Sequence, residues 1–213
     1  MEQPQKTFEN LAAEKRDRVL AEATREFAVH GYHQASVNRM VERLGIAKGS
    51  LFKYFGSKQG IFEYIFEHTV AQFKKPLKEI RDSASGDFFE RIELSLLACV
   101  DFIDRHPLIY RIYLKLAFQE NFPMREKFLA EIRQASGKYL RALVDHGMAS
   151  GQLRPGLDQD MIVFHLDAVM DRFLQTCAVP GLDSGTGLHG ADKATLQTKA
   201  RAVADILRHG LGA

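Results

Sequence analysis

Apolar residues recur three and four positions apart along most of this chain of 213 residues, the spacing of helices that bury one face. No stretch alternates apolar and polar residues as a half-buried strand does, and no repeat of roughly 20 to 50 residues is present. Apolar residues make up 46% of the chain, which is enough for a packed core. We therefore predict an all-α protein.

The predicted helix ends follow from capping residues, prolines and glycines. The first helix is expected to start after Asn10 and to end at Gly31. A helix of about five turns follows from Gly60 and contains Pro76. Further helices are predicted at residues 88–105, 108–120, 124–150, 159–178 and 191–209. Residues 180–190 contain four glycines and are expected to form a flexible connection.

Residues 36–55, SVNRMVERLGIAKGSLFKYF, have the pattern of two short helices joined by a tight turn at Gly45. The apolar residues on the faces that these helices share are Met40, Val41, Leu44, Ile46, Leu51 and Phe55. The residues left facing outward on the second helix include no carboxylate, and they are Lys48, Gly49, Ser50, Lys53 and Tyr54. Such a cationic face on a helix-turn-helix suits a DNA groove.

Two serines are expected to cap helices beside this motif. Ser36 precedes its first helix and Ser57 precedes the helix after it, so each hydroxyl can accept a backbone N–H. The positive end of a helix also attracts phosphate, so one serine can serve both purposes. At the N-terminus, Phe8 is expected to pack back onto the first helix. Lys6 and Thr7 belong either to a DNA-contacting arm or to a disordered polar leader.

The charge of the chain is uneven, although the formal net charge is only +2. Residues 1–78 hold 13 basic and 9 acidic residues, whereas residues 79–213 hold 16 and 18. Between Ser36 and Lys58 the single acid Glu42 stands against five basic residues, Arg39, Arg43, Lys48, Lys53 and Lys58. This local excess favours a polyanionic partner.

Residues 36–58, which end KGSLFKYFGSK, resemble the DNA-binding domain of the tetracycline-repressor (TetR) family of bacterial one-component regulators. The resemblance extends back through EFAVHGYHQAS and forward into GSKQGIFEYIF, about the first 70 residues. It implies a helix-turn-helix DNA-binding domain with an N-terminal arm at residues 1–58, a connecting helix at 59–82, and an effector-binding and dimerisation domain at 83–213. The rest of the chain resembles the family only in length and all-helical character.

The resemblance also implies the residues that contact DNA. The matching positions are Ser36, Val37, Asn38, Lys48, Gly49, Ser50, Phe52, Lys53, Tyr54 and Lys58. Lysine and hydroxyl side chains in this set are expected at phosphates, Gly49 permits close approach, and Lys53 reaches a base edge or a phosphate. Ala47 and Phe52 depart from the family pattern, because many members have serine and tyrosine there. A helix cap and a phosphate hydrogen bond are therefore missing.

Two further sites are expected in the second half of the chain. Most of its aromatic residues are predicted to be core, but a few should line a mostly apolar small-molecule pocket; the candidates are Phe89, Phe102, Tyr110, Tyr113, Phe118, Phe164 and Phe173. Apolar faces on the last two helices predict a homodimer through Met161, Phe164, Phe173, Leu196, Val203, Ile206 and Leu207. Alternatively, both faces belong to the protomer's own core.

Other chemistry has little support in the residues. Histidines are scattered, and although Asp167 and Asp171 follow His165, a solvated helix face explains them, so no metal or cofactor is expected. Cys99 and Cys177 match no metal or redox spacing and are expected to be free thiols. Without an apolar leader or a membrane-spanning run, a cytoplasmic protein is expected.

The combined prediction is a homodimeric, ligand-responsive transcriptional regulator. Repression of a pseudo-palindromic double-stranded DNA operator, relieved by a small apolar effector, is the expected mode. A helical protein-binding adaptor is the alternative, and salt-dependent DNA binding distinguishes the two. An all-helical enzyme is a further alternative, although no clustered polar groups at readable spacing support it.

Overall fold

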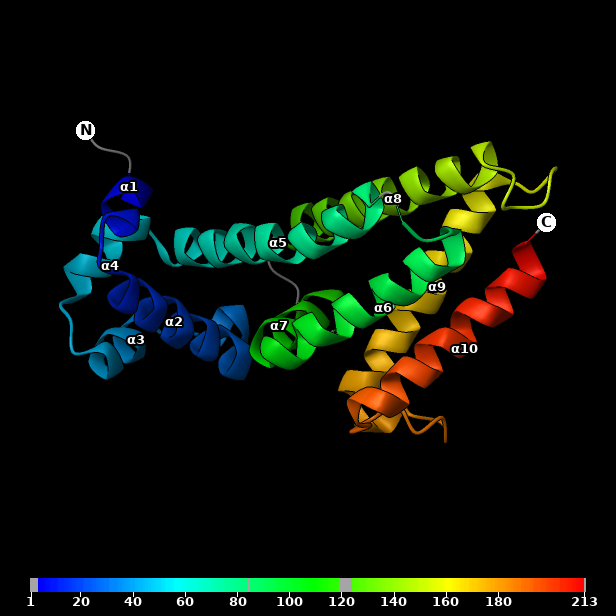
Figure 1. Ribbon diagram of the computed structural model, residues 1–213. Helices are drawn as coiled ribbons and strands as arrows, with labels where there is room; N and C mark the ends of the chain where they lie inside the picture. Colours follow the sequence, from blue (N-terminus) through cyan, green and yellow to red (C-terminus); the bar gives the residue numbers. More distant parts are fainter. Residues whose placement is uncertain (1–3, 84, 119–123, 213) are drawn as a thin grey trace. The chain divides into compact units, whose positions relative to one another are not determined.

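The computed structural model describes residues 4–83, 85–118 and 124–212, and these residues are largely helical (Figure 1). The helices are α1 (Pro4–Glu9), α2 (Ala13–Gln34), α3 (Val37–Leu44), α4 (Lys48–Phe55), α5 (Lys58–Asp82), α6 (Phe88–Arg105), α7 (Pro107–Phe118), α8 (Arg125–Ala149), α9 (Gln159–Ala178), the 3-10 helix η1 (Pro180–Leu182) and α10 (Lys193–Leu211). Helices α6 and α9 begin and end at the predicted residues, whereas the predicted end of α7 at residue 120 lies outside the described residues. The described residues contain no strand, and the predicted all-α fold is confirmed.

The described residues form two compact units. The first unit comprises residues 1–72 and 106–129, and the second unit comprises residues 73–105 and 130–213. Helix α7 packs with the N-terminal helices, because Ile112 and Leu116 are buried in the same cluster as Phe27 of α2. Helices α5 and α8 contribute residues to both units.

The N-terminal segment is more ordered than a polar leader. Residues 4–9, including Thr7, form α1, while residues 1–3 and the side chain of Lys6 lie outside the described part of the chain. Phe8 is fully buried, and its ring centroid lies 4.7 Å from that of Phe55 and 5.7 Å from that of Tyr54. Helix α1 therefore packs on α4, and Phe8 lies in the same buried cluster as Val19 and Ala23 of α2.

Helix α2 begins and bends at points that local chemistry explains. Its N-cap is Ala12, whose side chain makes no capping bond, so the predicted cap at Asn10 was wrong. At Gly31 the backbone leaves the helical region, with φ 71° and ψ 174°, which a residue without Cβ adopts readily. One more helical turn follows, and it sets the direction in which the chain enters α3.

The second unit is built around α6, which packs against α9 and α10 (Figure 1). Ile92 and Leu96 of α6 are fully buried in its apolar core. Cys99 lies in the same core as a free thiol, and burial raises its pKa to about 12. Cys177 is also free and half-buried.

Residues 180–190 are not a featureless flexible connection, in contrast to the prediction. One carboxylate oxygen of Asp183 accepts the backbone N–H groups of Thr186 (2.8 Å) and Gly187 (3.3 Å), and the other accepts that of His189 (2.9 Å). Leu188 is buried against the core of the second unit. The glycines therefore permit a specific turn that a hydrogen-bonded aspartate holds.

Candidate nucleic-acid interface

Helices α3 and α4 form the predicted helix-turn-helix. Gly45 adopts the left-handed conformation at φ 66° and ψ 35°, and its N–H donates to the carbonyl of Glu42 at 3.2 Å. Met40 and Leu51 are fully buried and Phe55 nearly so, which places one face of each helix in the core of the first unit. The prediction of two helices that share a core is confirmed.

The predicted serine caps are also confirmed. The hydroxyl of Ser36 accepts the N–H of Arg39 at 3.4 Å, and that of Ser57 accepts the N–H of Gly60 at 3.0 Å. Ala47 precedes α4 without a side-chain capping bond, as its methyl side chain requires. The cap position of α4 therefore supplies no side-chain acceptor to the first N–H groups of this helix.

The outward face of α4 is cationic and open. Lys48 and Lys53 are exposed, Ser50 is half-buried, and Phe52 is 37% exposed with the Lys48 ammonium 5.7 Å from its ring centroid. Apart from its two chain neighbours and the nearby backbone of its own helix, no heavy atom of the described residues lies within 4 Å of the position that a Cβ would take at Gly49. These groups have the cation, the hydroxyl and the close backbone approach that phosphate contact requires.

Helix α3 adds two residues of the predicted interface. Asn38 is exposed, whereas Val37 is half-buried and packs against the core of the first unit. A side chain that supports the core is available to DNA only in part. Asn38 is therefore the better placed of the two for a polar contact.

Tyr54 does not face outward, and that prediction was wrong. Its side chain is only 7% exposed, because its ring packs against Phe8 of α1 and Phe55 of its own helix. The sequence pattern of α4 alone gives no indication of this burial, since the covering residue comes from a helix that the pattern did not predict.

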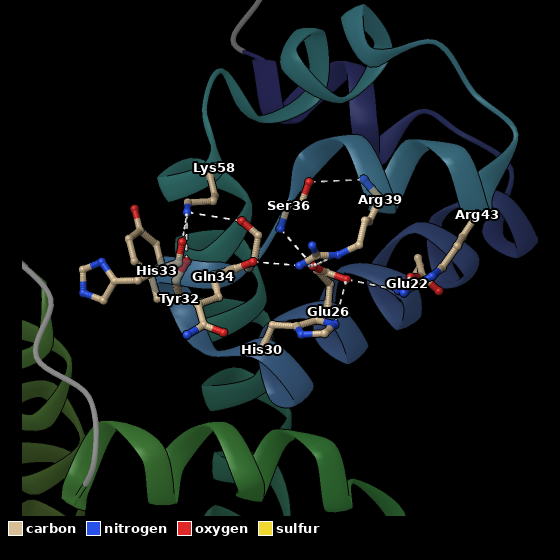
Figure 2. A network of polar contacts seen from close by, with 11 residues as sticks. Glu22, Glu26, His30, Tyr32, His33, Gln34, Ser36, Arg39, Arg43 and Lys58 are labelled. Carbon is tan, nitrogen blue, oxygen red and sulfur yellow. Dashed lines mark hydrogen bonds and ion pairs between the residues drawn. The ribbon is translucent and has the colours of Figure 1, made fainter.

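Lys58 has a partner other than the expected phosphate. Its Nζ donates to the carbonyls of Tyr32 (2.9 Å), His33 (3.2 Å) and Ala35 (3.3 Å), and it lies 4.9 Å from the ring centroid of Tyr32. These carbonyls belong to the last turn of α2 and the residue after it, where the helix leaves acceptors free. In the DNA-free protein Lys58 ties the start of α5 to the end of α2 (Figure 2).

A buried carboxylate joins α2 to α3, and sequence analysis did not find it. Glu26 has no solvent exposure, and its Oε1 accepts the backbone N–H of Ser36 (2.9 Å) and Nε of Arg39 (2.9 Å), with a further bond from Nη2 of Arg39. Its Oε2 accepts Nη1 of Arg43 at 3.1 Å and lies 3.8 Å from Nε2 of His30. Figure 2 shows these groups converging from both helices.

Two of the five basic residues near the motif, Arg39 and Arg43, are therefore paired with carboxylates of α2, although their side chains remain 40% and 37% exposed. Arg43 also donates to Glu22 at 2.8 Å, and Arg39 also donates to the carbonyl of Gln34 at 2.7 Å. Burial by itself raises the pKa of Glu26, but the hydrogen bonds from Arg39 and Ser36 outweigh it, so the pKa lies below its ordinary value of 4.5. The positive face of the motif reduces to α4, with Lys48 and Lys53 as its cations.

One pattern in the sequence does indicate this network. Glu26 lies between Ala23 and Phe27 on the apolar face of α2, where a carboxylate is out of place. A buried carboxylate requires cationic partners, and the nearest arginines along the chain are on the next helix.

The predicted pocket residues divide between the two units. Phe89, Phe102 and Phe173 are buried in the second unit. Tyr110 and Tyr113 belong to α7 in the first unit, where their ring centroids lie 5.5 Å apart. Phe118 and Phe164 are 64% and 67% exposed, so the described residues enclose neither of them. For these two side chains the pocket stays a prediction.

The predicted dimer residues also fall into two groups. Phe173, Leu196 and Leu207 are buried in the core of the second unit, as the alternative interpretation of these faces requires, and Val203 is half-buried against it. The members that face solvent are Met161, Phe164 and Ile206, which are 57%, 67% and 73% exposed. Only this second group is available to another protomer.

Other kinds of site are not found in the described part of the chain. Among those residues no three histidine, cysteine or acidic side chains lie close enough together to hold a metal ion. Asp167 and Asp171 instead pair with Arg133, at 3.0 and 3.2 Å. The helices of that same part include none long and apolar enough to cross a membrane.

Comparison with known proteins connects this geometry to a family. Residues 19–65 match the family described as bacterial regulatory proteins, tetR family. The chain is 29% identical over 147 residues to the fatty acid metabolism regulator protein of Bacillus subtilis (strain 168), covering 66% of this chain and 71% of that protein. It is 24% identical over 168 residues to the HTH-type transcriptional repressor AcnR of Corynebacterium diphtheriae, covering 78% and 83%. The crystal structure of a TetR family transcriptional regulator from Chloroflexus aurantiacus J-10-FL matches with a TM-score of 0.75 at 28% identity, over 98% of each chain.

Proposed function

The chain belongs to the tetR family of bacterial regulatory proteins, and on that premise we propose that it is a homodimeric transcriptional repressor that a small-molecule effector releases from its operator. The observation that carries the proposal is the outward face of α4. Lys48 and Lys53 are exposed there on a helix without carboxylates, next to the open backbone at Gly49. This combination fits a helix that approaches DNA closely in the major groove.

The rest of the motif supports α4 as a rigid contact surface. Glu26 links α2 to α3, Gly45 fixes the turn, and Phe8 holds α1 against α4. None of these groups needs to touch DNA. Their contribution is to keep α4 in one orientation, which reduces the entropy lost when it enters a groove.

Repression and release follow from two-fold geometry. In a dimer the two α4 helices must lie about 34 Å apart, or a multiple of it, to enter successive major grooves of a pseudo-palindromic site. An effector that binds more tightly to a dimer in which the two α4 helices have a different separation weakens operator binding. The loss of operator affinity cannot exceed the ratio of the effector's affinities for the two forms. The names of the relatives support this mode, since one is a repressor and another a fatty acid metabolism regulator.

The exposed apolar residues on α9 and α10 support the dimer. Met161, Phe164 and Ile206 would be covered if these helices met their copies across a two-fold axis. Phe164→Asp or Ile206→Asp should give a folded monomer that has lost operator affinity. Val29→Asp, at an apolar residue of α2 that is 43% exposed, is the control. A wild-type protein that sediments as a monomer at micromolar concentration would reject the dimer.

Selection of bound fragments from genomic DNA, followed by titration at several salt concentrations, tests the function itself. Lys48→Ala and Lys53→Ala should each weaken binding and lower the dependence of log affinity on log salt by about one. Lys199→Ala removes an exposed lysine from α10 and should change neither quantity. The absence of salt-dependent DNA binding by the wild-type protein would overturn the proposal.

A further inference from the structure

The second unit contains a buried arginine that lacks a carboxylate partner. Arg91 of α6 is only 6% exposed, and its Nη2 donates to the carbonyl of Ser83 at 2.7 Å. Its Nε is buried and makes no hydrogen bond among the described residues. No ion pair to Arg91 is found in the described part of the chain either.

Such an arrangement is unusual for a guanidinium group. Arginine carries a permanent charge and five N–H donors in a planar fork that matches a carboxylate or a phosphate. Burying this charge without an anion is costly, so buried arginines are normally paired. The surroundings of Arg91 therefore have the properties of an anion site that none of the described residues fills.

Two hydroxyl groups are linked to the backbone of Arg91. Ser95, one turn further along α6 and fully buried, donates its hydroxyl proton to the carbonyl of Arg91 at 2.6 Å. The Tyr139 hydroxyl of α8 lies 2.6 Å from the same Ser95 Oγ. Since the Ser95 proton is already used, Tyr139 is the donor in that contact. The Tyr139 O–H can turn from Ser95 toward a bound ligand and leave the bond from Ser95 to Arg91 intact.

The electrostatics of Tyr139 agree with the role of a donor. Burial is the main cause that raises the pKa of Tyr139 to about 12, and Cys99 raises it further. The hydrogen bond to Ser95 and the charges of Arg81 and Arg91 lower this pKa, but by less. The phenol is therefore protonated at neutral pH. Of the two arginines that face it, Arg81 is paired with Asp82, so Arg91 is the one left for an anion.

The remaining neighbours define the rest of the ligand. Helix α6 also carries Ile92, Leu96 and Cys99 into the apolar core, and it bears Phe89 and Phe102 of the predicted pocket set. Tyr139 is only partly buried, whereas Arg91 and Ser95 are buried. A ligand bound at Arg91 would have its charged end there and its remainder among apolar side chains.

We propose that Arg91 and Tyr139 bind the head group of the effector, which is a small molecule with one carboxylate or phosphate and an apolar remainder. The inference rests on the function proposed above and deepens it, because it assigns the chemical class of the effector. The anion would accept from Nε of Arg91 and from the Tyr139 hydroxyl. The competing explanation is that Arg91 serves only to cap the carbonyl of Ser83 at the end of α5.

The test uses the full chain bound to a DNA fragment that it selects. Decanoate, decyl phosphate and decanol, each below its micelle concentration, are compared for DNA release and for their effect on the melting temperature. Decanoate or decyl phosphate should act while decanol does not, and the active one identifies the head group. Arg91→Met should raise the concentration needed for half-release at least about tenfold, and Tyr139→Phe should raise it several-fold.

Matched variants separate a ligand site from a helix cap. Arg154→Met removes an exposed arginine that also donates to a carbonyl of a helix end, at Gly210, and should leave the response unchanged. Arg91→Lys keeps the charge but lacks Nε, so it should fold and respond weakly even if Arg91→Met is unstable. Decanol acting as well as the anions, no response to either anion, or an unchanged response of both Arg91 variants would overturn the anion site. These results leave the regulator intact, whereas failure of the wild-type protein to bind DNA overturns the proposed function instead.

Discussion

Each compact unit buries one charged side chain among its described residues, and the two charges are satisfied in opposite ways. Glu26 in the first unit is met by the guanidinium groups of Arg39 and Arg43 and by a backbone N–H. Arg91 in the second unit has one carbonyl and an Nε without a partner. The first arrangement is complete within the described residues, and the second would be completed by the anion proposed above.

This difference separates a structural role from a binding role. A buried charge with all its partners fixes the geometry of the elements that supply them, here the junction of α2 and α3. A buried charge without such partners destabilises the folded protein, and a ligand of opposite charge would reduce this destabilisation. Neither assignment depends on the other, so each has its own tests.

The largest expected effect is on the complete network. Glu26→Gln keeps the shape of the side chain but removes the charge that Arg39 and Arg43 share, so the free energy of unfolding should fall by about 2 to 3 kcal/mol. Urea denaturation measures it. Glu22→Gln, one turn earlier and paired only with arginines at the surface, should cost about 0.5 kcal/mol. Equal losses for both variants would show that burial of Glu26 is unimportant.

The same network predicts a dependence on acid. The folded pKa of Glu26 lies below 4.5, so its ionised form favours folding. This stabilisation is complete above pH 4.5 and is lost as the pH falls through the folded pKa, by at most about 1.4 kcal/mol per pH unit. Denaturation at a series of pH values should therefore show the gap between wild type and Glu26→Gln closing in acid.

A control is needed because Nε2 of His30 lies 3.8 Å from the same carboxylate. The His30→Gln variant removes the imidazole and should leave the closing of the gap in place. A gap that stays constant down to the lowest pH at which both proteins fold would contradict the assignment of the pKa.

Sequence analysis predicted the parts of this molecule that depend on one helix at a time. The limits of α6 and α9 follow from nearby breakers and caps, and the inward positions Leu51 and Phe55 follow from helical spacing. The serine caps were predictable for the same reason, because a cap and its N–H lie three residues apart.

The parts that were not predicted depend on residues from another helix. Tyr54 was expected to face outward because the spacing within α4 gives no indication that Phe8 of α1 covers it. Lys58 was assigned to phosphate because the carbonyls it contacts belong to the end of α2. Glu26 was overlooked because its partners are 10 or more residues away. Periodicity indicates which side of a helix is covered, but not which side chain covers it.

A smaller effect concerns the two serine caps, which differ in their link to Glu26. Ser57→Ala should cost about 1 kcal/mol, because its hydroxyl is the side-chain acceptor at the start of α5. Ser36→Ala should cost less, since the cap bond is long at 3.4 Å and Glu26 still holds the Ser36 N–H. Urea denaturation of both variants tests the order. A larger loss for Ser36→Ala would show that Glu26 does not support the start of α3.

The smallest expected change in stability is at Arg91, although Arg91 is almost as deeply buried in the second unit as Glu26 is in the first. Arg91→Met keeps a flexible apolar side chain, loses the bond to Ser83, which is worth about 1 kcal/mol, and removes the buried charge that has no anion. These contributions oppose each other, and replacing buried charges by apolar residues is often neutral or stabilising. The free energy of unfolding should therefore change by less than about 1 kcal/mol without ligand, or rise. Urea denaturation with and without decanoate makes the contrast with Glu26→Gln direct, since the wild-type protein and Glu26→Gln should both gain stability from the anion and Arg91→Met should not. A loss as large as that of Glu26→Gln in the absence of ligand would mean that Arg91 is a structural group like Glu26, satisfied by the end of α5.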